Sequence, residues 1–405
     1  MPKTIAIIGT LDTKGPEVAF LRDFVKGKGH RPCVIDPGVL EAPAVPADIT
    51  RQQVAQAGGA DLADLIAAGD KGRAMQTMID GTRAIVTRLY AEGKLDAALA
   101  VGGGQGTAIG AAAMQALPIG VPKLMVSTIA SGPRTFEPYV GTTDMTLMHS
   151  VADIAGLNAI TRRVFTNAAA AIVGMAEVSG PIEKSRWRVI GTTMLGLTTP
   201  CVLHARACLE AWGYEVVTFH PNGTGGRCLE RLADEGLMQG VMDVSLQELT
   251  GYLCHGLFDA GPERLKAAAR RGLPQVVAPG GTDYIVLGPM ASLTADQRQR
   301  PFIIHNPNIT LVRTSKAEMA QIGKLMAQRL NDSTAPVAVL VPLRGFSYSD
   351  RPGHAFYDPE ADAALVGALE ASLAPHVELH KLELHVNDAA FAEAVAQKMR
   401  EIMGK

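Results

Sequence analysis

Residues 97–107 read AALAVGGGQGT, an uncharged run that passes into four glycines within positions 102–106. A continuous apolar run is typical of a parallel strand that helices cover on both faces. A glycine turn between a strand and a helix bends tightly and points free N–H groups at a bound anion. Because glycine loses much backbone entropy on folding, packing alone rarely accounts for so many. The stretch therefore predicts a strand, an anion-binding turn and a helix.

The same alternation of short apolar runs and longer segments of helical period extends in both directions. We expect strands at 3–8, 31–35, 97–101 and 123–126, and then at 188–191, 215–219, 241–243, 275–278, 302–305 and 337–341. Helices are expected at 16–28, 61–67, 71–92, 107–117 and 158–171, and then at 200–212, 227–235, 262–271, 316–330 and 361–373. This pattern predicts an α/β fold with mostly parallel sheets.

A break near residue 180 predicts two domains. SGP at 179–181, followed by the highly charged segment EKSR at 183–186, interrupts the alternation, so we expect Rossmann-like domains at 1–180 and 181–405 with a ligand cleft between them. The halves also echo each other: IIGT at 7–10 with VIGT at 189–192, IDP at 35–37 with FHP at 219–221, and VGGG at 101–104 with APGG at 278–281. Three echoes in the same order indicate a duplicated domain.

The composition excludes several classes of partner. The 405 residues carry a formal net charge of −2 and no block of like charges, so we expect neither nucleic acid nor a membrane as a partner. The N-terminus lacks the apolar core of a signal peptide, which predicts a cytoplasmic protein. Five cysteines, never spaced CxxC, indicate mostly buried, reduced thiols. The histidines show no metal-ligand spacing, although magnesium held through nucleotide phosphates stays open.

Two glycine loops of the first half are the strongest candidates for holding phosphate. GTLDTKG at 9–15 offers two hydroxyls, a carboxylate and the ammonium of Lys14 before Pro16, which we expect to begin a helix. The alternative is a plain turn in which Asp12 or Thr13 caps that helix. The second loop is GGGQGT at 102–107. Neither loop matches the Walker A pattern or GxGxxG cleanly, so a usual P-loop NTPase or NAD dehydrogenase is unsupported.

Further polar loops follow other predicted strands. STIASGPR at 127–134 and GTTD at 141–144 lie in the first half, and GTT at 191–193 and HPNGTGGR at 220–227 lie in the second. The alternative for 127–134 is a loop that satisfies itself through ST turns. We expect the following residues to contact the nucleotide: Gly9, Thr10, Asp12, Thr13, Lys14, Gly102, Gly103, Gly104, Gly106, Thr107, Ser131, Gly132, Thr142, Asp144, Gly191, Thr192, Gly225 and Gly226.

Three residues of the second half are candidates for catalysis. His220 and Asp243 end predicted strands, where either could act as a general base, and Arg227 at a helix start could clamp an anionic substrate. Equally open are a histidine that is hydrogen-bonded at a domain interface and an aspartate that caps a helix. The sequence has no G-x-S-x-G elbow and no cysteine beside a base, so covalent catalysis is not indicated.

The loops at 9–15, 102–107 and 141–144 occur in order with TTPC at 198–201 and FYDPE at 356–360. In this combination the chain resembles the Tm-1-like ATP-binding family, also called UPF0261, over essentially its whole length. The resemblance implies two Rossmann-like domains that bind ATP and tend to form a homodimer. We expect a stand-alone bacterial-type member without the C-terminal barrel of the plant protein, because the sequence ends at Lys405 after one more helix.

The plant member inhibits replication of a tobamovirus, but that property depends on surface residues that face one viral partner, so we do not carry it over. ATP binding would use the glycine loops themselves and is our main expectation. Two alternatives stay open. One is a phosphotransferase or ligase-like enzyme that acts on a small carboxylate or sugar acid. The other is a nucleotide-gated module for protein interaction.

Overall fold

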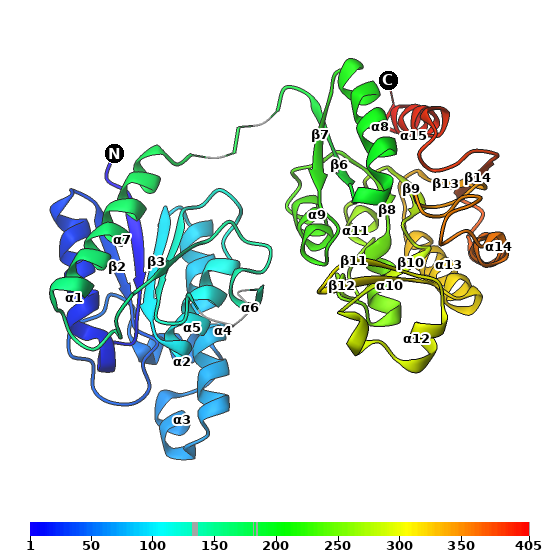
Figure 1. The fold of residues 1–405 in the computed structure, drawn as a ribbon. Helices are drawn as coiled ribbons and strands as arrows, with labels where there is room; N and C mark the ends of the chain where they lie inside the picture. The colour runs from blue at the N-terminus through cyan, green and yellow to red at the C-terminus, as the bar shows by residue number, and fades with distance from the viewer. Residues whose placement is uncertain (132–136, 181, 184, 405) are drawn as a thin grey trace. The chain divides into compact units, whose positions relative to one another are not determined.

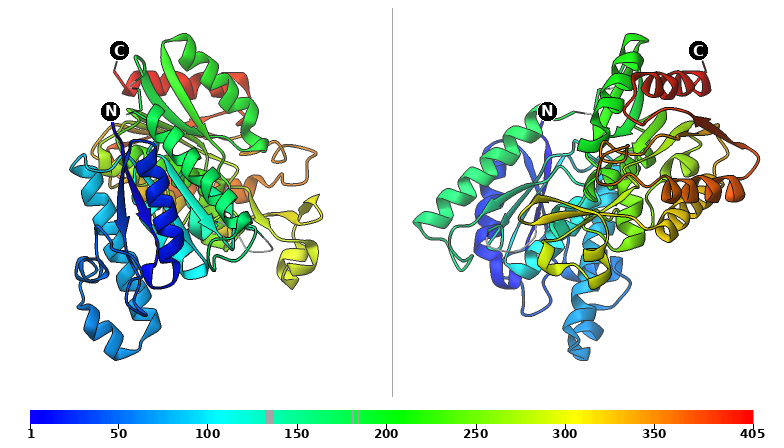
Figure 2. Two further views of the ribbon diagram at one scale, coloured as in Figure 1. Left: turned by 90° about the vertical axis from the view of Figure 1, so that its left-hand side faces the viewer. Right: turned by 45° about the vertical axis from the view of Figure 1, so that its right-hand side comes forward.

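The computed structural model describes residues 1–131, 137–180, 182–183 and 185–404. The chain forms two compact units, Met1–Glu183 and Lys184–Lys405, which we call unit 1 and unit 2 and describe separately (Figure 1). In each unit a parallel sheet carries helices on both faces, as Figures 1 and 2 show. The predicted α/β class, with mostly parallel sheets and two Rossmann-like domains, is therefore confirmed.

The sheet of unit 1 consists of parallel strands in the order β2-β1-β3-β4-β5. The strands are β1 (Thr4–Ile8), β2 (Arg31–Ile35), β3 (Ala97–Gly102), β4 (Lys123–Ser127) and β5 (Thr146–His149). Because side chains alternate along a strand, Ile5 and Ile7 of β1 pack into one apolar cluster, whereas Ala6 and Ile8 pack into another. Burial on both faces explains why the central strands are continuous apolar runs.

Helices from different parts of unit 1 cover these two faces. Helices α1 (Leu11–Gly27) and α7 (Ala159–Val178) pack on one face. The other face carries α2 (Arg51–Ala57), α3 (Leu62–Ala68), α4 (Lys71–Ala91) and α5 (Gly104–Gln115), and the short α6 (Glu137–Val140) contacts α5. The helices before and after β3 thus share a face, while α1 lies on the opposite one.

Helix α1 begins at Leu11, not at Pro16 as predicted, so the loop that we expected at 9–15 is shorter. Thr10 has extended backbone and stands as the N-cap, although its side chain makes no capping bond. The backbone of Lys14, at φ −124° and ψ 20°, interrupts the helical geometry. Pro16 therefore follows a kink, which removes the conflict between a proline and a regular helix interior.

The main sheet of unit 2 is also parallel, in the order β14-β13-β9-β8-β6-β7. Its strands are β6 (Arg188–Thr193), β7 (Tyr214–Phe219), β8 (Gly240–Ser245), β9 (Gln275–Gly280), β13 (Val337–Pro342) and β14 (Val377–Leu382). A separate antiparallel sheet joins β10 (Tyr284–Leu287), β12 (Ile309–Arg313) and β11 (Phe302–Asn306). The strand predicted at 302–305 therefore exists, but outside the parallel sheet, because β12 pairs with it directly.

Both faces of this parallel sheet are covered too. Helices α8 (Thr199–Ala211) and α15 (Ala389–Ile402) pack on one face, and α10 (Gln247–Cys254), α13 (Lys316–Leu330) and α14 (Pro359–Ser372) pack on the other. Helices α9 (Thr224–Asp234) and α11 (Ala267–Arg271) share a smaller cluster. The remaining short elements are η1 (Gly196–Thr198), η2 (Met290–Ser292) and α12 (Ala295–Gln299).

The two parallel sheets share one strand order, apart from the extra edge strand β14. In both, the first strand lies between the second and the third, so β1 corresponds to β6, β2 to β7, and β3 to β8. The first two sequence echoes pair equivalent strands. The third echo does not, because β9 is the fourth strand of its sheet, whereas β3 is the third. The number of residues between the first and the third echo is nevertheless similar in the two halves, because α2, α3 and α4 lengthen the connection before β3.

Candidate functional site

A cavity of about 250 Å³ lies at the carboxyl ends of β1 and β3 in unit 1. These strands are neighbours, and the helices that follow them, α1 and α5, cover opposite faces of the sheet. Open α/β sheets bind ligands at such a switch point, where the connections diverge. The cavity brings together both predicted phosphate loops and is lined by Thr10, Asp12, Thr13, Lys14, Pro37, Val39, Leu40, Met75, residues 102–106 and Ile109.

Helix α5 presents its N-terminus to this cavity. Its N-cap, Gly103, contributes no side-chain cap, and the first N–H groups of a helix have no partner within it. A Cβ on Gly102 would lie 2.6 Å from the Cα of Gly106, so the turn itself requires that glycine. By contrast, a Cβ on Gly104 would meet no described atom within 4 Å. Packing does not require Gly104 to be glycine, whereas close approach of a ligand to the backbone would.

The first turn of α1 forms the opposite side of the cavity. The hydroxyls of Thr10 and Thr13 lie 2.8 Å apart, and the Lys14 ammonium donates to the carbonyl of Ile154. No carboxylate among the described residues forms an ion pair with Lys14, so its positive charge is not neutralised. Gly9 is not part of the lining. A Cβ there would lie 2.6 Å from Cγ2 of Val18, so this glycine lets α1 pack against β1.

Two carboxylates shape the same side. Asp36, at the end of β2, accepts hydrogen bonds from the N–H groups of Leu11 (3.0 Å) and Gly38 (2.9 Å). Burial raises its pKa despite these bonds, and the nearby charge of Asp12 adds to the rise. Asp12 accepts from the Leu40 N–H through Oδ2 at 2.9 Å, whereas its Oδ1 is buried without a partner among the described groups. Sequence reasoning had not assigned Asp36 to the site, although its position directly after β2 was the available signal.

Several residues predicted to contact the nucleotide lie elsewhere in unit 1. The hydroxyl of Thr107 points into the protein and lies 2.7 Å from that of Ser127, so it joins α5 to β4. Asp144 pairs with the ammonium of Lys123 at 2.7 Å, at the amino end of β4. Asp144, and Thr142 two residues before it, therefore precede β5 at the edge of the sheet opposite the cavity. None of these three residues lines the cavity, so we do not expect them to contact a nucleotide bound there.

The predicted loop at 127–134 continues the carboxyl edge of the sheet beyond β3. Gly102, Ser127 and His149 are in register on β3, β4 and β5, so they form one row at this edge. Ser131 lies on the same side, with its hydroxyl 3.3 Å from Nε2 of His149. Gly132, which we also predicted as a contact, lies outside the described residues.

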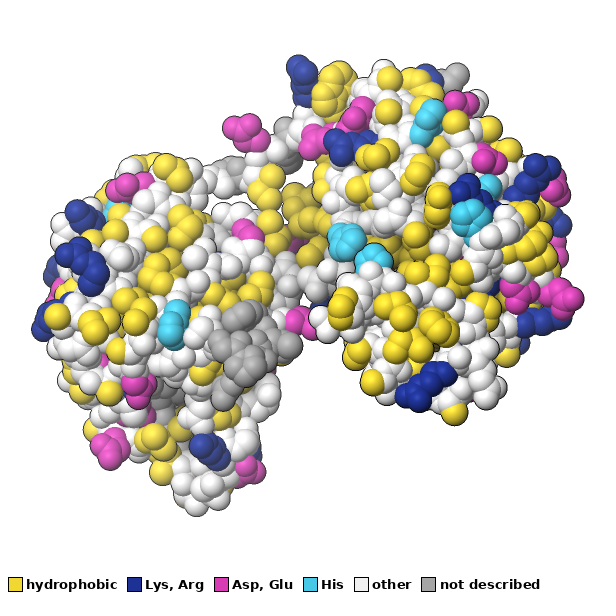
Figure 3. Space-filling model, in the orientation of Figure 1, with side chains coloured by type: hydrophobic (Ala, Val, Ile, Leu, Met, Phe, Trp, Pro, Cys, Tyr) yellow, Lys and Arg dark blue, Asp and Glu magenta, His cyan; other side chains and the backbone are white. Residues whose placement is uncertain are grey.

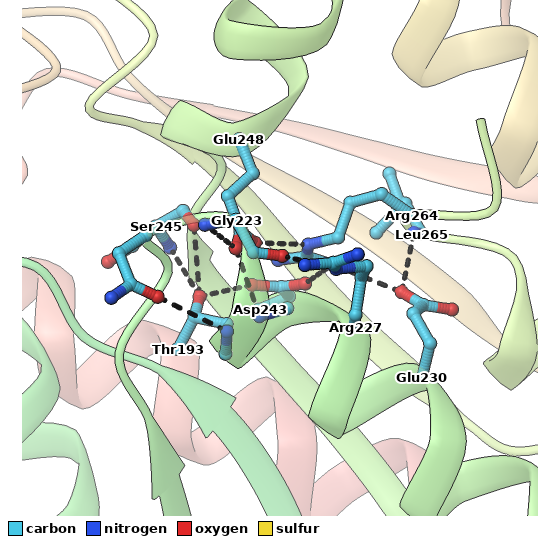
Figure 4. Close-up of polar contacts among 12 residues, drawn as sticks. Thr193, Gly223, Arg227, Glu230, Asp243, Ser245, Glu248, Arg264 and Leu265 are labelled. Atoms are coloured by element: carbon cyan, nitrogen blue, oxygen red, sulfur yellow. Dashed lines mark hydrogen bonds and ion pairs between the residues drawn. The ribbon is translucent and has the colours of Figure 1, made fainter. Parts of the chain in front are cut away.

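In unit 2 the start of helix α9 is occupied by the protein itself (Figure 4). Oε1 of Glu248 accepts hydrogen bonds from the N–H groups of Gly223 (2.7 Å) and Gly226 (3.0 Å). A Cβ on Gly226 would lie 1.8 Å from Oε2 of Glu248, so the carboxylate fits directly against this glycine. The N–H groups that we expected at a nucleotide phosphate therefore bind an internal carboxylate. Gly226 with its neighbour Gly225 is accordingly a packing feature in this structure.

A buried arginine holds that carboxylate in place. Arg264 is fully buried, with Nε 2.7 Å from Glu248 and Nη1 2.6 Å from Asp243 and 3.2 Å from Glu230. These acids keep its pKa well above the ordinary value although burial opposes charge. Glu230 in turn accepts from backbone N–H groups at the start of α11, and burial raises the pKa of its carboxyl. Arg264 thus joins the starts of α9 and α11.

The predicted catalytic residues do not form one site. Asp243 is fully buried, accepts from the hydroxyl of Thr193 and pairs with Arg264, so no substrate can reach its carboxylate. His220 is exposed, with Nδ1 3.3 Å from the carbonyl of Met194. Arg227 donates through Nε to the carbonyl of Gly223 at 3.1 Å. The prediction that Asp243 acts as a general base is therefore wrong for this structure, in which Asp243 belongs to the ion network of Arg264.

The remaining nucleotide contacts predicted for unit 2 are also internal. A Cβ on Gly191 would lie 2.4 Å from the sulfur of Met238, so this glycine serves the packing of β6. Thr192 is fully buried. Among the described residues, the cavity that the predicted residues line lies at the switch point of unit 1.

Fold and site together define a protein with two Rossmann-type units, one of which has an uncapped, glycine-rich helix start at its switch point. Family models give the identity. The model described as "Uncharacterised protein family (UPF0261) N-terminal domain" matches residues 3–181, and the corresponding C-terminal domain matches residues 187–403. The chain belongs to the UPF0261 family.

Curated relatives agree with this assignment. A UPF0261 protein of Clostridium tetani is 40% identical over 100% of both chains, and one of Mesorhizobium japonicum is 40% identical over 97% of this chain and 98% of its own. The ToMV resistance protein Tm-1(GCR237) of Solanum lycopersicum is 35% identical over 83% of this chain, which corresponds to 45% of the tomato protein. The shared region is thus about half of the plant protein and the whole of the bacterial one.

The described residues show neither a membrane-spanning helix nor a metal-ligand cluster. None of their helices is long and apolar enough to span a bilayer. In the same part of the chain, no three His, Cys, Asp or Glu side chains gather as metal ligands would. On the face drawn in Figure 3, basic side chains are scattered among acidic and apolar ones. Of the five cysteines only Cys201 is fully buried, so the expectation of mostly buried thiols was too strong.

Proposed function

We propose that the protein binds a nucleotide polyphosphate, ATP in the first place, in the cavity of unit 1. The observation that carries this proposal is the start of α5, where a Cβ on Gly104 would meet no atom of the described residues within 4 Å and the N-cap glycine offers no side-chain cap. Such a helix start attracts anions through its N–H groups and its dipole. Lys14, which has no carboxylate partner among the described residues, supplies a positive charge on the opposite wall.

Size and polarity of the cavity support a phosphate chain with part of the nucleoside. Its volume of about 250 Å³ is close to the lower end of typical small-molecule pockets. Val39, Leu40, Met75 and Ile109 give it an apolar portion beside the glycine turn. Charge and glycine at one end and apolar side chains at the other suit a ligand that is itself divided in this way.

The same cavity has a group that fits a magnesium ion carried by the nucleotide. Asp12 lines the cavity, and its Oδ1 is buried without a described partner. Magnesium in nucleotide sites is commonly held by one or two carboxylates together with the substrate phosphates. Asp12 would therefore hold the ion, which would neutralise phosphate charge, while Thr10, Thr13 and Lys14 orient the phosphates.

Calorimetric titration of the full chain with ATP and Mg²⁺ tests the proposal. We expect wild type to bind, Gly104→Val to lose at least about tenfold in affinity because the side chain occupies the ligand's position, and Lys14→Gln to lose about tenfold because a charged hydrogen bond is removed. Asp12→Asn should weaken binding with Mg²⁺ more than without it. No binding by wild type at millimolar ATP would refute the proposal.

Matched controls separate loss of the ligand from loss of the fold. Gly174→Val lies in α7, where a Cβ likewise meets open space, and Lys28→Gln removes an exposed charge just after α1. Both should keep wild-type affinity. Phosphate release measured in the same samples would decide whether the alternative of a phosphotransferase or ligase-like reaction applies. A homodimer and a cytoplasmic location stay predictions, the first testable by light scattering.

A further inference from the structure

The segment 343–358, between β13 and α14, has no regular secondary structure yet follows a fixed path. Irregular loops of this length are uncommon in compact domains and are usually functional or disordered. This one is held by backbone hydrogen bonds to distant parts of unit 2, from Gly281 to Phe346, from Val386 to Gly345 and from Tyr348 to Leu197. Gly281 follows β9 and Leu197 follows β6, so the loop extends along the carboxyl edge of the sheet, where α/β proteins bind ligands.

Buried polar groups support the loop from below. The Ser347 hydroxyl donates to Asp283 at 2.6 Å, and Asp350 accepts from the Phe346 N–H at 2.8 Å. His385 Nε2 lies 2.9 Å from the carbonyl of Ser347. Asp283 and Asp350 are fully buried. Buried polar networks of this kind rigidify the structure around them, which fixes the groups on the outer side of the loop.

Three side chains on that outer side form one cluster. The guanidinium of Arg351 lies 4.3 Å from the ring centroid of Tyr348, and its Nε donates to Nε2 of His354 at 3.0 Å. Tyr348 and His354 meet edge to face, with centroids 5.4 Å apart. Tyr348 is 48% exposed, and the other two are half-buried. Stacking and one hydrogen bond therefore fix the plane of the guanidinium.

The two outer nitrogens of Arg351 are available to a ligand, as far as the described residues show. Neither Nη1 nor Nη2 has a hydrogen bond or an ion pair with any described residue, and His354 already takes up Nε. A guanidinium in a fixed plane, with both outer N–H pairs open, matches the two oxygens of a carboxylate or phosphate group. By comparison, the outer nitrogens of Arg313 donate hydrogen bonds to internal partners, among them Asp362 at 2.6 Å.

We propose that Tyr348, Arg351 and His354 form an oxyanion-binding platform in unit 2, which takes the carboxylate or phosphate group of a small molecule. The platform consists of residues of unit 2 alone, and the proposal does not rest on nucleotide binding in unit 1. Unit 2 thereby has its ligand position on the loop over the sheet edge, while the start of α9 is filled by Glu248.

Titration of the nucleotide-free full chain with succinate and with inorganic phosphate, followed by calorimetry or ligand-observed NMR, tests the platform. Wild type should bind at least one probe, and the comparison of the two identifies the preferred oxyanion. Arg351→Gln should weaken binding about tenfold or more, and Arg351→Lys and Tyr348→Leu by less, because each keeps part of the platform. Arg344→Gln, an exposed arginine on the same loop, is the control and should bind as wild type does.

Two outcomes would overturn the platform. One is no binding of either probe by wild type at tens of millimolar, and the other is equal loss in Arg344→Gln and Arg351→Gln, which would indicate a general charge effect. ATP titration of the Arg351 variants distinguishes this proposal from the one for unit 1. Unchanged ATP affinity together with lost oxyanion binding supports two separate sites, and unchanged thermal unfolding shows that the loop keeps its fold.

Discussion

The starts of α5 in unit 1 and α9 in unit 2 have nearly the same composition and opposite surroundings. Both are rich in glycine and have no side-chain cap on the N-cap residue. At α5 no described atom lies within 4 Å of the position of a Cβ on Gly104, whereas at α9 the carboxylate of Glu248 accepts hydrogen bonds from the N–H groups of Gly223 and Gly226. The start of α9 therefore binds a carboxylate of the protein itself, whereas the start of α5 has no such internal partner among the described residues.

Removing the internal anion should have the largest effect. In Glu248→Ala the N–H groups of α9 and the guanidinium of Arg264 lose a fully buried partner, so we expect the free energy of unfolding to fall by about 3–5 kcal/mol. Urea unfolding of the full chain measures this. The control is Glu263→Ala, which removes an exposed carboxylate next to Arg264 in the sequence and should change the free energy of unfolding little. A loss as small as that of the control would mean that Glu248 is not an internal ligand.

The same variant tests whether the two helix starts are equivalent as anion sites. If Glu248 stands where an anion would bind, its removal leaves an anion site at α9. Added phosphate should then raise the thermal unfolding temperature of Glu248→Ala more than that of wild type. Equal stabilisation of both would contradict the equivalence of the two helix starts.

Placing one methyl group at each helix start should give effects of opposite sign. Gly226→Ala should destabilise by about 1–3 kcal/mol, because its Cβ would lie 1.8 Å from Glu248. Gly104→Ala should leave stability unchanged or raise it by about 0.5–1 kcal/mol, because nothing opposes the methyl group and alanine favours the helix. Unfolding of both variants without nucleotide tests this. Equal destabilisation would refute the open space at α5.

The buried acids beneath the 343–358 loop predict a pH dependence of unit 2. Burial, together with the charge of Asp350, raises the pKa of Asp283 to about 7 and that of Asp362 to about 9, from the ordinary 3.8. The folded state then binds more protons than the unfolded state above about pH 4, so stability should decline as the pH rises towards 9. We expect a decline of a few kcal/mol between pH 5 and pH 8.5, because each unit of pKa shift corresponds to about 1.4 kcal/mol, and a smaller decline in Asp362→Asn. The midpoints of urea unfolding at pH 5 and pH 8.5 measure this decline. An equal change of the midpoint with pH in wild type and in Asp362→Asn would contradict the raised pKa of Asp362.

The smallest effect concerns Thr107, which the sequence suggested as a nucleotide contact. Its hydroxyl lies 2.7 Å from that of Ser127 inside the protein, so Thr107→Val should cost about 1 kcal/mol of stability. ATP affinity should stay as in wild type. A tenfold loss of affinity with unchanged stability would return Thr107 to the ligand.

Sequence patterns located most of the parallel strands to within two residues at either end, because burial on both faces makes these strands continuous apolar runs. They missed the edge strands β5 and β14, which are only partly buried, and also β10 and β12, whose antiparallel pairing brings together segments distant in the chain. In the site, the two loops of unit 1 were found from glycine and hydroxyl content. Asp36 and Leu40 were not, because their role depends on the approach of the loop after β2 to the start of α1.

The alternation of strands and helices and the positions of glycine at helix starts follow from the amino-acid sequence alone, because they depend on short-range periodicity and backbone freedom. Which helix start is filled by an internal side chain depends on tertiary contacts. Glu248 comes from α10 and Arg264 from the segment before α11, and both reach α9 only once the sheet of unit 2 has formed. The two helix starts differ because of these contacts between segments distant in the chain. The local sequence around the glycines does not indicate such contacts.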